Sequence, residues 1–132
     1  MFRTANHHLR VGGLFVFDCW YGPAVLSDPP VVRVRRIDEP DTSIVRVAEP
    51  AMQPRRNVVD VHYQVLVMDR ASRVTESIRE THSVRYFFDP ELERFARENG
   101  FEIVAAREWL RDAEPSFRSW FACYVGRRIE AT

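Results

Sequence analysis

The sequence predicts an α+β fold in which an antiparallel β meander is inserted into a smaller sheet that carries one clear helix. Four strand patterns occupy the middle of the chain, and the turn-rich pieces between them are too short for crossover helices. The flanking segments instead combine continuous apolar strands with a helix start, which is typical of sheets packed against helices. At 132 residues and 45% hydrophobic content, the chain has room for one ordinary core.

The first thirty residues predict a helix end, a glycine turn and a buried strand. Gly12-Gly13 ends a weak helical pattern over residues 1–10, and the apolar run 14–17 suits a strand buried on both faces. This strand carries Trp20 and Tyr21 at its carboxyl end, where open α/β sheets bind their ligands.

The four strand patterns of the meander cover residues 31–37, 43–49, 58–69 and 74–88. Alternation in the third pattern places Tyr63 on one face and His62 on the other. In the fourth, His82 shares a face with Tyr86 and with acidic residues, so the middle of that face is expected to be solvated.

The last part of the chain returns to alternating helix and strand. Asp89 is expected to be the N-cap of a helix with Pro90 at its first position, and Gly100 is expected to end it. Strands follow over 101–106 and 120–126, the second antiparallel to the first.

Composition limits the classes of function. Nineteen basic and nineteen acidic residues cancel, which gives no electrostatic argument for nucleic acid or for an anionic membrane. Every basic residue is Arg, so lysine chemistry is excluded. The chain has no run of about 18 apolar residues and no signal-peptide core, and Cys19 and Cys123 suit reduced thiols, so we expect a cytoplasmic protein. The adjacent pair His7-His8 does not converge on one ion, so no metal site is expected.

Several segments, in order, resemble the C-terminal half of class I S-adenosylmethionine-dependent methyltransferases. The glycine turn and strand at 11–18 resemble the fifth sheet strand of that family, and Leu-Glu-Arg-Phe-Ala-Arg-Glu-Asn-Gly-Phe at 92–101 resembles the helix and corner before the sixth. Residues 120–127 resemble the seventh, antiparallel strand, and the meander resembles the β lid of enzymes that methylate small amines and amino sugars. Two short segments, Trp-Tyr-Gly-Pro at 20–23 and His-Ser-Val-Arg-Tyr-Phe at 82–87, strengthen the resemblance to that subgroup.

The resemblance implies one domain over 1–132, with a methyltransferase-sheet remnant at 1–30 and 89–132 and an inserted antiparallel lid at 31–88. The family holds its cofactor on a glycine-rich loop after the first strand, where glycine lets the backbone approach the ligand. None of the five glycines here forms Gly-x-Gly, so we expect no cofactor-binding residue in this chain. S-adenosylmethionine is implied only for the complete family fold, and the isolated chain is expected to be an incomplete, inactive enzyme.

The function implied is therefore that of the lid and substrate portion of a methyltransferase acting on an amine or hydroxyl of a small molecule. The alternative is a non-catalytic module for oligomerisation or small-ligand binding. An exposed strand edge at 14–18 would seek either another copy of the chain or an N-terminal methyltransferase half. No catalytic residue is assigned; the substrate-lining candidates are Trp20, Tyr21, His62, His82, Arg85 and Tyr86. For each of these, ordinary packing, a solvated sheet face or a structural salt bridge is the competing interpretation.

Overall fold

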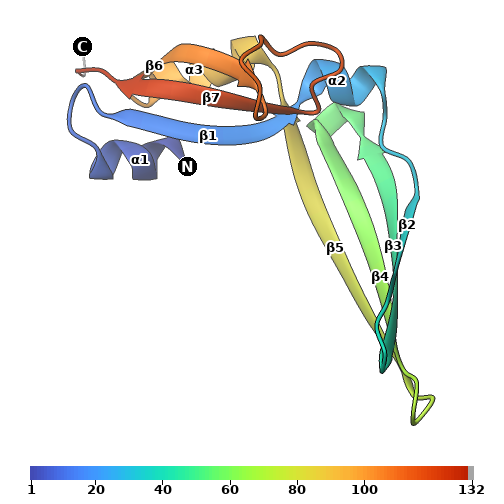
Figure 1. Ribbon diagram of the computed structural model, residues 1–132. Helices are drawn as coiled ribbons and strands as arrows, with labels where there is room; N and C mark the ends of the chain where they lie inside the picture. The colour runs from blue at the N-terminus through green and yellow to red at the C-terminus, as the bar shows by residue number, and fades with distance from the viewer. Residues whose placement is uncertain (131–132) are drawn as a thin grey trace. The chain divides into compact units, whose positions relative to one another are not determined.

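The computed structural model describes residues 1–130 and contains a mixed seven-stranded sheet with few helices (Figure 1). This confirms the α+β class and its antiparallel meander. The strand order is β2-β3-β4-β5-β1-β7-β6. In chain order, the elements are α1 (Phe2–His8), β1 (Leu14–Tyr21), α2 (Gly22–Ser27), β2 (Arg33–Asp38), β3 (Thr42–Gln53), the 3₁₀ turn η1 (Pro54–Arg56), β4 (Val58–Asp69), β5 (Thr75–Phe87), α3 (Asp89–Glu98), β6 (Phe101–Glu108) and β7 (Phe121–Arg128).

The chain divides into two compact units, which are described separately. Unit 1 comprises Met1–Pro29 and Tyr86–Thr132, and unit 2 comprises Pro30–Arg85. The prediction of a sheet remnant up to residue 132 includes two residues, 131 and 132, that lie outside the described part of the chain.

Unit 1 is built on β1, β7 and β6. Both β1 and β6 are antiparallel to β7, so they run in the same direction. On its other edge, β1 pairs in parallel with the end of β5, through Trp20↔Tyr86 and Tyr21↔Phe87. One face of this sheet carries the core, because α1 and α3 supply apolar side chains to it. The core residues are Phe2, Phe17, Tyr21, Ala24, Leu92, Ala96, Phe101, Ala122 and Tyr124.

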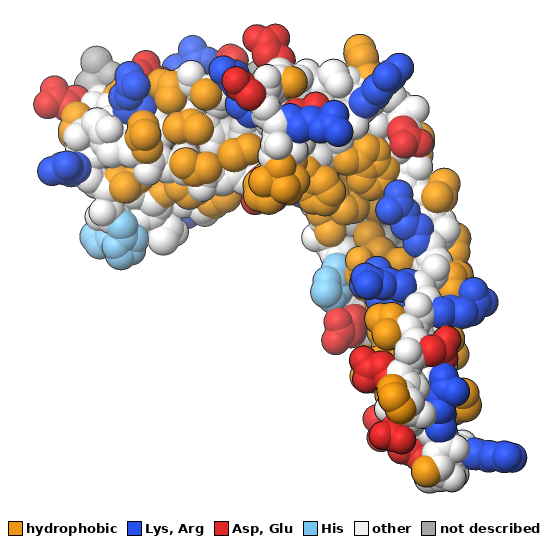
Figure 2. Space-filling model, viewed as in Figure 1, with side chains coloured by type: hydrophobic (Ala, Val, Ile, Leu, Met, Phe, Trp, Pro, Cys, Tyr) orange, Lys and Arg blue, Asp and Glu red, His pale blue; other side chains and the backbone are white. Residues whose placement is uncertain are grey.

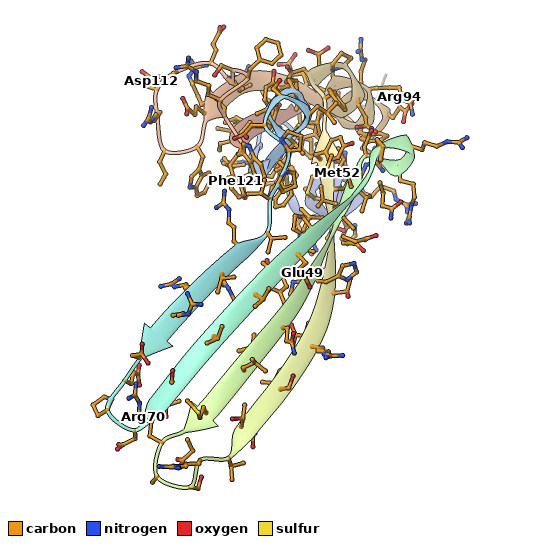
Figure 3. The ribbon with its side chains drawn as sticks, turned by 90° about the vertical axis from the view of Figure 1, so that its right-hand side faces the viewer. Glu49, Met52, Arg70, Arg94, Asp112 and Phe121 are labelled. Carbon is orange, nitrogen blue, oxygen red and sulfur yellow. The ribbon has the colours of Figure 1, made fainter. Side chains whose placement is uncertain are left out.

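Unit 2 is an antiparallel meander of β2, β3, β4 and the first part of β5 (Figure 3). Strand β3 is longer than predicted: it runs through Pro50 to Gln53 and stays in register with β4 to its end. Strand β2 reaches only Ala48 on the other side of β3, so Pro50 lies where that edge is unpaired. A proline is tolerated at such a position because no ladder hydrogen bond is lost there.

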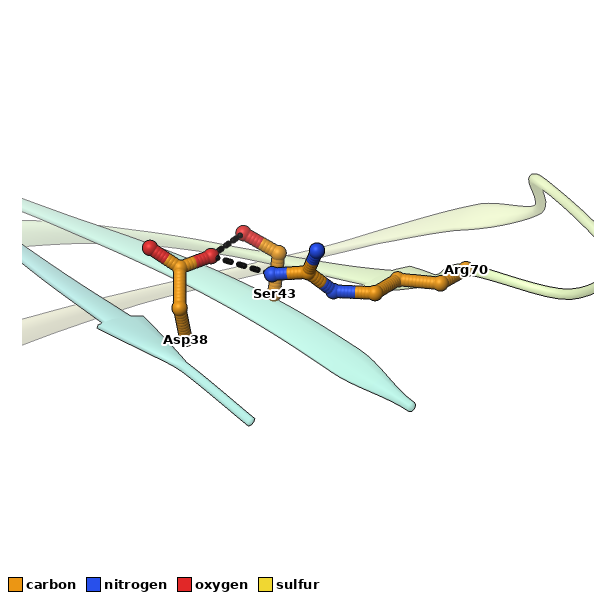
Figure 4. A network of polar contacts seen from close by, with 3 residues as sticks. All are labelled: Asp38, Ser43 and Arg70. Carbon is orange, nitrogen blue, oxygen red and sulfur yellow. Dashed lines mark hydrogen bonds and ion pairs between the residues drawn. The ribbon is translucent and has the colours of Figure 1, made fainter. Parts of the chain in front are cut away.

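A small polar network closes the tip of the meander. Asp38 Oδ1 accepts hydrogen bonds from Ser43 Oγ at 2.9 Å and from the Arg70 guanidinium at 2.7 Å (Figure 4). The network links the β2–β3 turn to the β4–β5 turn. Both charged side chains are roughly half exposed, at 46% and 63%, so water screens most of their attraction.

Candidate functional site

Aromatic side chains gather at the carboxyl end of β1. Because β1 and β6 run in the same direction, their carboxyl ends and the start of β7 lie at one end of the unit 1 sheet. There the Trp20 ring lies 5.3 Å from the Trp120 ring and 6.1 Å from the Phe121 ring (Figure 3 labels Phe121). We refer to Trp20, Trp120 and Phe121 as the aromatic cluster. It occupies the position at which open α/β sheets bind ligands.

Trp20 and Phe121 stand on the sheet face opposite the core, whereas Trp120 also packs against the core. Alternation along β1 places Leu14, Val16, Asp18 and Trp20 on this outer face, and the register with β7 adds Phe121 and Val125. Asp18 is exposed, two residues before Trp20 on the same side. A carboxylate beside tryptophan faces is chemically suited to a small organic cation, through charge attraction and cation–π contact.

On the core face, a single carboxylate holds two buried tyrosines. The Tyr124 hydroxyl donates to Asp89 Oδ1 at 2.7 Å, and the Tyr21 hydroxyl donates to Asp89 Oδ2 at 3.1 Å. Burial and the adjacent carboxylate raise the pKa of Tyr21 to about 12 and raise that of Tyr124 further. These hydroxyls stay protonated at neutral pH, so they act as donors and not as bases.

Asp89 differs from its predicted role as an N-cap. It is the first residue of α3, the N-cap position is Phe88, and no side chain caps the helix. Its carboxylate is engaged by the two tyrosines instead. A cavity of about 430 Å³ opens beside this arrangement, between the start of α3, β6 and the loop at Glu114.

The side chains of Trp20 and Tyr21 lie on opposite faces of the sheet, although the two residues are adjacent in sequence. Trp20 faces outward, whereas Tyr21 is 8% exposed and belongs to the core. Tyr86 is also buried, with no exposed surface, and packs edge-on against Phe88 at 6.0 Å. Of the three candidates in unit 1, only Trp20 is therefore accessible from the outer face.

The remaining candidates belong to unit 2. Its register pairs His62 with Thr81 and Val61 with His82, so the two histidines lie on opposite faces of the meander. His62 Nδ1 lies 2.9 Å from Thr81 Oγ1, and His82 Nε2 lies 2.9 Å from Glu80 Oε2. These two side chains cannot approach one substrate from the same side of this sheet.

Arg85 lies on the His62 face of the meander, opposite Val58. The face with His82 also carries Tyr63, whose ring lies 5.2 Å from His82 and 5.8 Å from the Arg46 guanidinium carbon. The meander thus presents a polar and aromatic surface on one side and a hydroxyl-rich surface on the other.

Sequence reasoning did not identify the aromatic partners of Trp20. Trp120 and Phe121 lie about one hundred positions along the chain, at the start of β7. The sequence predicts that the last two strands pair in antiparallel fashion, but this does not say which residues meet Trp20. The register Trp20↔Phe121 between β1 and β7 brings the rings of Trp120 and Phe121 to Trp20.

Within residues 1–130, no group of three or more His, Cys, Asp or Glu side chains is placed to hold a metal ion. The helices of that range are all too short or too polar to cross a membrane. No Gly-x-Gly turn follows β1 or β6.

No model of a known protein family matches the chain, and no curated protein matches it. Solved structures do match. An S-adenosylmethionine-dependent methyltransferase from Clostridium acetobutylicum aligns with a TM-score of 0.77 at 16% identity, over 98% of this chain and 50% of that one. The sugar N-methyltransferase KedS8 from Streptoalloteichus aligns with a TM-score of 0.74 at 21% identity, over 98% of this chain and 47% of its own.

A third similar structure is CalS10 from Micromonospora echinaspora, an amino pentose methyltransferase solved with S-adenosylmethionine bound. It aligns with a TM-score of 0.70 at 19% identity, over 96% of this chain and 48% of the CalS10 chain. The chain therefore spans about half the length of the solved structures it resembles, as expected for a C-terminal half. Its fold is that of about half of a S-adenosylmethionine-dependent methyltransferase, which confirms the resemblance drawn from the sequence.

Proposed function

We propose that this chain is the acceptor-binding portion of an S-adenosylmethionine-dependent methyltransferase, with unit 2 as its β lid. The acceptor would be an amine or hydroxyl of a small molecule such as an amino sugar. The observation that carries this proposal is the fold match, which extends over 96–98% of the chain while covering 47–50% of three solved methyltransferases. Two of those three are described as acting on a sugar or an amino pentose.

The aromatic cluster is the proposed acceptor site. Trp20 offers a flat face on which a sugar ring can stack, with the Trp120 ring tilted against it, and Asp18 offers a carboxylate for the ammonium group of the sugar. The contribution of these residues is to bind and orient the acceptor, which is the main catalytic task when a bound cofactor supplies the reactive group.

The acceptor site can be tested with the chain alone and D-glucosamine as the probe. Binding should change the tryptophan fluorescence of the chain, and Trp20→Ala should abolish that change. Trp109→Ala is the matched control, because Trp109 is 46% exposed and lies outside the aromatic cluster. An unaltered response in Trp20→Ala would assign binding to another surface and refute the aromatic-cluster site.

The cofactor side of the proposal predicts that the isolated chain does not bind S-adenosylmethionine. Too few contacts are available here to offset the entropic cost of binding. Calorimetry with S-adenosylmethionine and S-adenosylhomocysteine measures this directly. A dissociation constant near 1 μM, about −8 kcal/mol, would show that this chain holds the cofactor after all.

The second candidate function is a non-catalytic module for oligomerisation or small-ligand binding. The observation that favours it is the missing Gly-x-Gly turn, together with a meander whose strands β2 and β5 are exposed over almost their whole length. If supplying a cofactor-binding half restores neither cofactor binding nor methyl transfer, this second function is the better description.

A further inference from the structure

The loop that joins β6 to β7 exposes large apolar side chains to water. Trp109 is 46% exposed, Leu110 85% and Phe117 70%. We refer to these three residues as the apolar loop. Exposed apolar side chains that occur singly are ordinary, whereas a group of them marks a binding surface.

The backbone holds Leu110 in water at a cost. Leu110 has φ of 58°, in the left-handed region that favours Gly, Asn and Asp. A leucine in this region is strained, and here it gains no burial in return. Two hydrogen bonds fix the turn, from Arg111 N to Glu108 O at 3.1 Å and from Glu108 N to Ala113 O at 2.8 Å. The loop therefore keeps an apolar residue at a position where a polar one would suit the backbone better.

A second turn of the same loop presents Phe117. The amide of Ser116 donates to Ser119 Oγ at 2.9 Å, and the amide of Ser119 donates to Ser116 O at 2.9 Å. Ser119 is 2% exposed, although Phe117 lies between these two serines in the chain. A polar side chain is thus buried to hold the turn while an aromatic one stays in water, which is the reverse of the usual partition.

The apolar loop extends the aromatic cluster across the sheet. The amide of Trp109 donates to Phe121 O at 3.0 Å, and Phe121 pairs with Trp20 in the register of β1 and β7. These three aromatic residues therefore form one row across β1, β7 and the end of β6. Neighbouring strands lie about 4.8 Å apart, so the row spans about 10 Å, and one sugar ring covers only part of it. Figure 2 shows apolar side chains spread over the region where Figure 1 draws β1 and β7.

We propose that the apolar loop binds an apolar group attached to the acceptor sugar, so that the acceptor is a glycoside of an aromatic or other apolar compound. This rests on the proposed function, because Trp20 and Asp18 would hold the amino sugar itself. The apolar loop is then a second subsite, which determines how tightly different acceptors bind. D-glucosamine has no second ring and leaves this subsite empty.

The charges around the apolar loop disfavour a phosphate-linked group and an anionic membrane surface. Arg107 Nε is already paired with Asp112 Oδ1 at 3.0 Å. The other charges of this region cancel, two against two: Arg111 and Arg118 against Glu108 and Glu114. Phosphate groups and anionic lipids bind where positive charge is in excess, so an uncharged apolar group suits this surface better.

A protein partner is a poorer occupant because the apolar surface is small. Large apolar side chains bury about 150–250 Å² each when they are wholly covered. At the fractions exposed here, the apolar loop and Phe121 together fall short of the ~800 Å² per partner of a stable protein interface. The same surface is sufficient for one or two rings of a small molecule.

The test compares two probes by NMR titration of the full chain: D-glucosamine and phenyl 2-amino-2-deoxy-β-D-glucopyranoside. We expect the phenyl glycoside to bind at least about tenfold more tightly, because its ring buries apolar surface against the loop. Leu110→Asn should lower this preference about threefold or more, because it removes an apolar contact. Asn suits the left-handed backbone, so this variant is expected to fold.

Arg73→Asn is the matched control. Arg73 has the same φ of 58°, but it lies in the turn between β4 and β5 of unit 2. The substitution relieves the same backbone strain and should leave the preference for the phenyl glycoside unchanged. Thermal unfolding of both variants establishes that they fold.

Two results would overturn the second subsite: equal affinity of the wild-type chain for the two probes, or the same preference in Leu110→Asn as in Arg73→Asn. Sedimentation of the chain with phosphatidylglycerol vesicles, lost in Leu110→Asn, would make a membrane the occupant and also overturn it. Binding of D-glucosamine without a preference for the phenyl glycoside would remove only this subsite and leave the proposed acceptor site standing. Binding of neither probe would remove both.

Discussion

At the scale of single residues, Asp89 is the polar centre of unit 1. Its two carboxylate oxygens accept from Tyr21, at the end of β1, and from Tyr124, in the middle of β7. The carboxylate thereby fixes the start of α3 to two strands of the sheet. Hydrogen bonds to a charged acceptor in a partly buried place stabilise more than exposed ones do.

Tyr124→Phe tests the strength of this arrangement. The ring can keep its packing, since only the hydroxyl is lost, and Asp89 keeps its bond from Tyr21. We expect a loss of about 1.5–3 kcal/mol in the free energy of unfolding, measured by urea denaturation. The control is Tyr63→Phe in unit 2, whose ring contacts Arg46 and His82, and it should change stability by less than about 0.5 kcal/mol. Equal effects of the two substitutions would contradict the role given to Asp89.

Cys19 is the second residue whose chemistry the fold alters. Burial, with the nearby carboxylates of Asp18 and Asp89, raises the pKa of its thiol from 9.0 to about 12. At pH 8 the thiolate is about a thousandfold rarer than in a free thiol, and the higher intrinsic nucleophilicity recovers only part of that.

We therefore expect the Cys123→Ser variant, which keeps only Cys19, to react with iodoacetamide about 50-fold more slowly than a free thiol at pH 8. Its rate should continue to rise above pH 9, where the rate of a free thiol levels off, because the folded-state pKa is the higher one. A rate that levels off near pH 9 would show that the thiol is not buried as described.

At the scale of elements, a glycine with positive φ follows α3 and another precedes β1. Gly100 has φ of 75°, and a Cβ there would meet Asn6 Nδ2 at 2.7 Å. That amide donates to Asn99 O, which links α1 to the end of α3. Gly12 has a similar φ of 82°, but a Cβ there meets nothing within 4 Å.

The two positions form a matched pair. Gly12→Ala should cost about 1 kcal/mol from backbone strain alone, whereas Gly100→Ala should cost more because it also displaces Asn6. Thermal unfolding of both variants measures the difference. A smaller effect at Gly100 than at Gly12 would mean that the contact with Asn6 is readily relaxed.

At the scale of the whole molecule, the two units should differ in stability. The core cluster belongs to unit 1, whereas β2 and most of β5 in unit 2 are exposed. Hydrogen exchange should therefore be faster for the amides of unit 2 than for those of β7 and α3. Uniform protection across both units would show that unit 2 is stabilised by contacts stronger than its burial suggests.

The sequence alone determined the α+β class, the meander and the order of the final helix and strands, because alternation, short turns and a Pro-started helix are local signals. It also determined the absence of a Gly-x-Gly turn, and its ordered segments pointed to the methyltransferase fold that the solved structures share. Local patterns could not predict that β3 continues through Pro50, because a proline is tolerated there only where β2 no longer pairs with β3.

Only the tertiary structure decided which side chains meet. Trp20 and Tyr21 are neighbours in sequence, yet the strand sends one to the aromatic cluster and the other to Asp89. Trp120 joins Trp20 because strand register, a long-range property, aligns β7 with β1. The backbone groups of β1 alternate between its two edges, and only the register with β7 decides that the odd-numbered residues are the bonded ones.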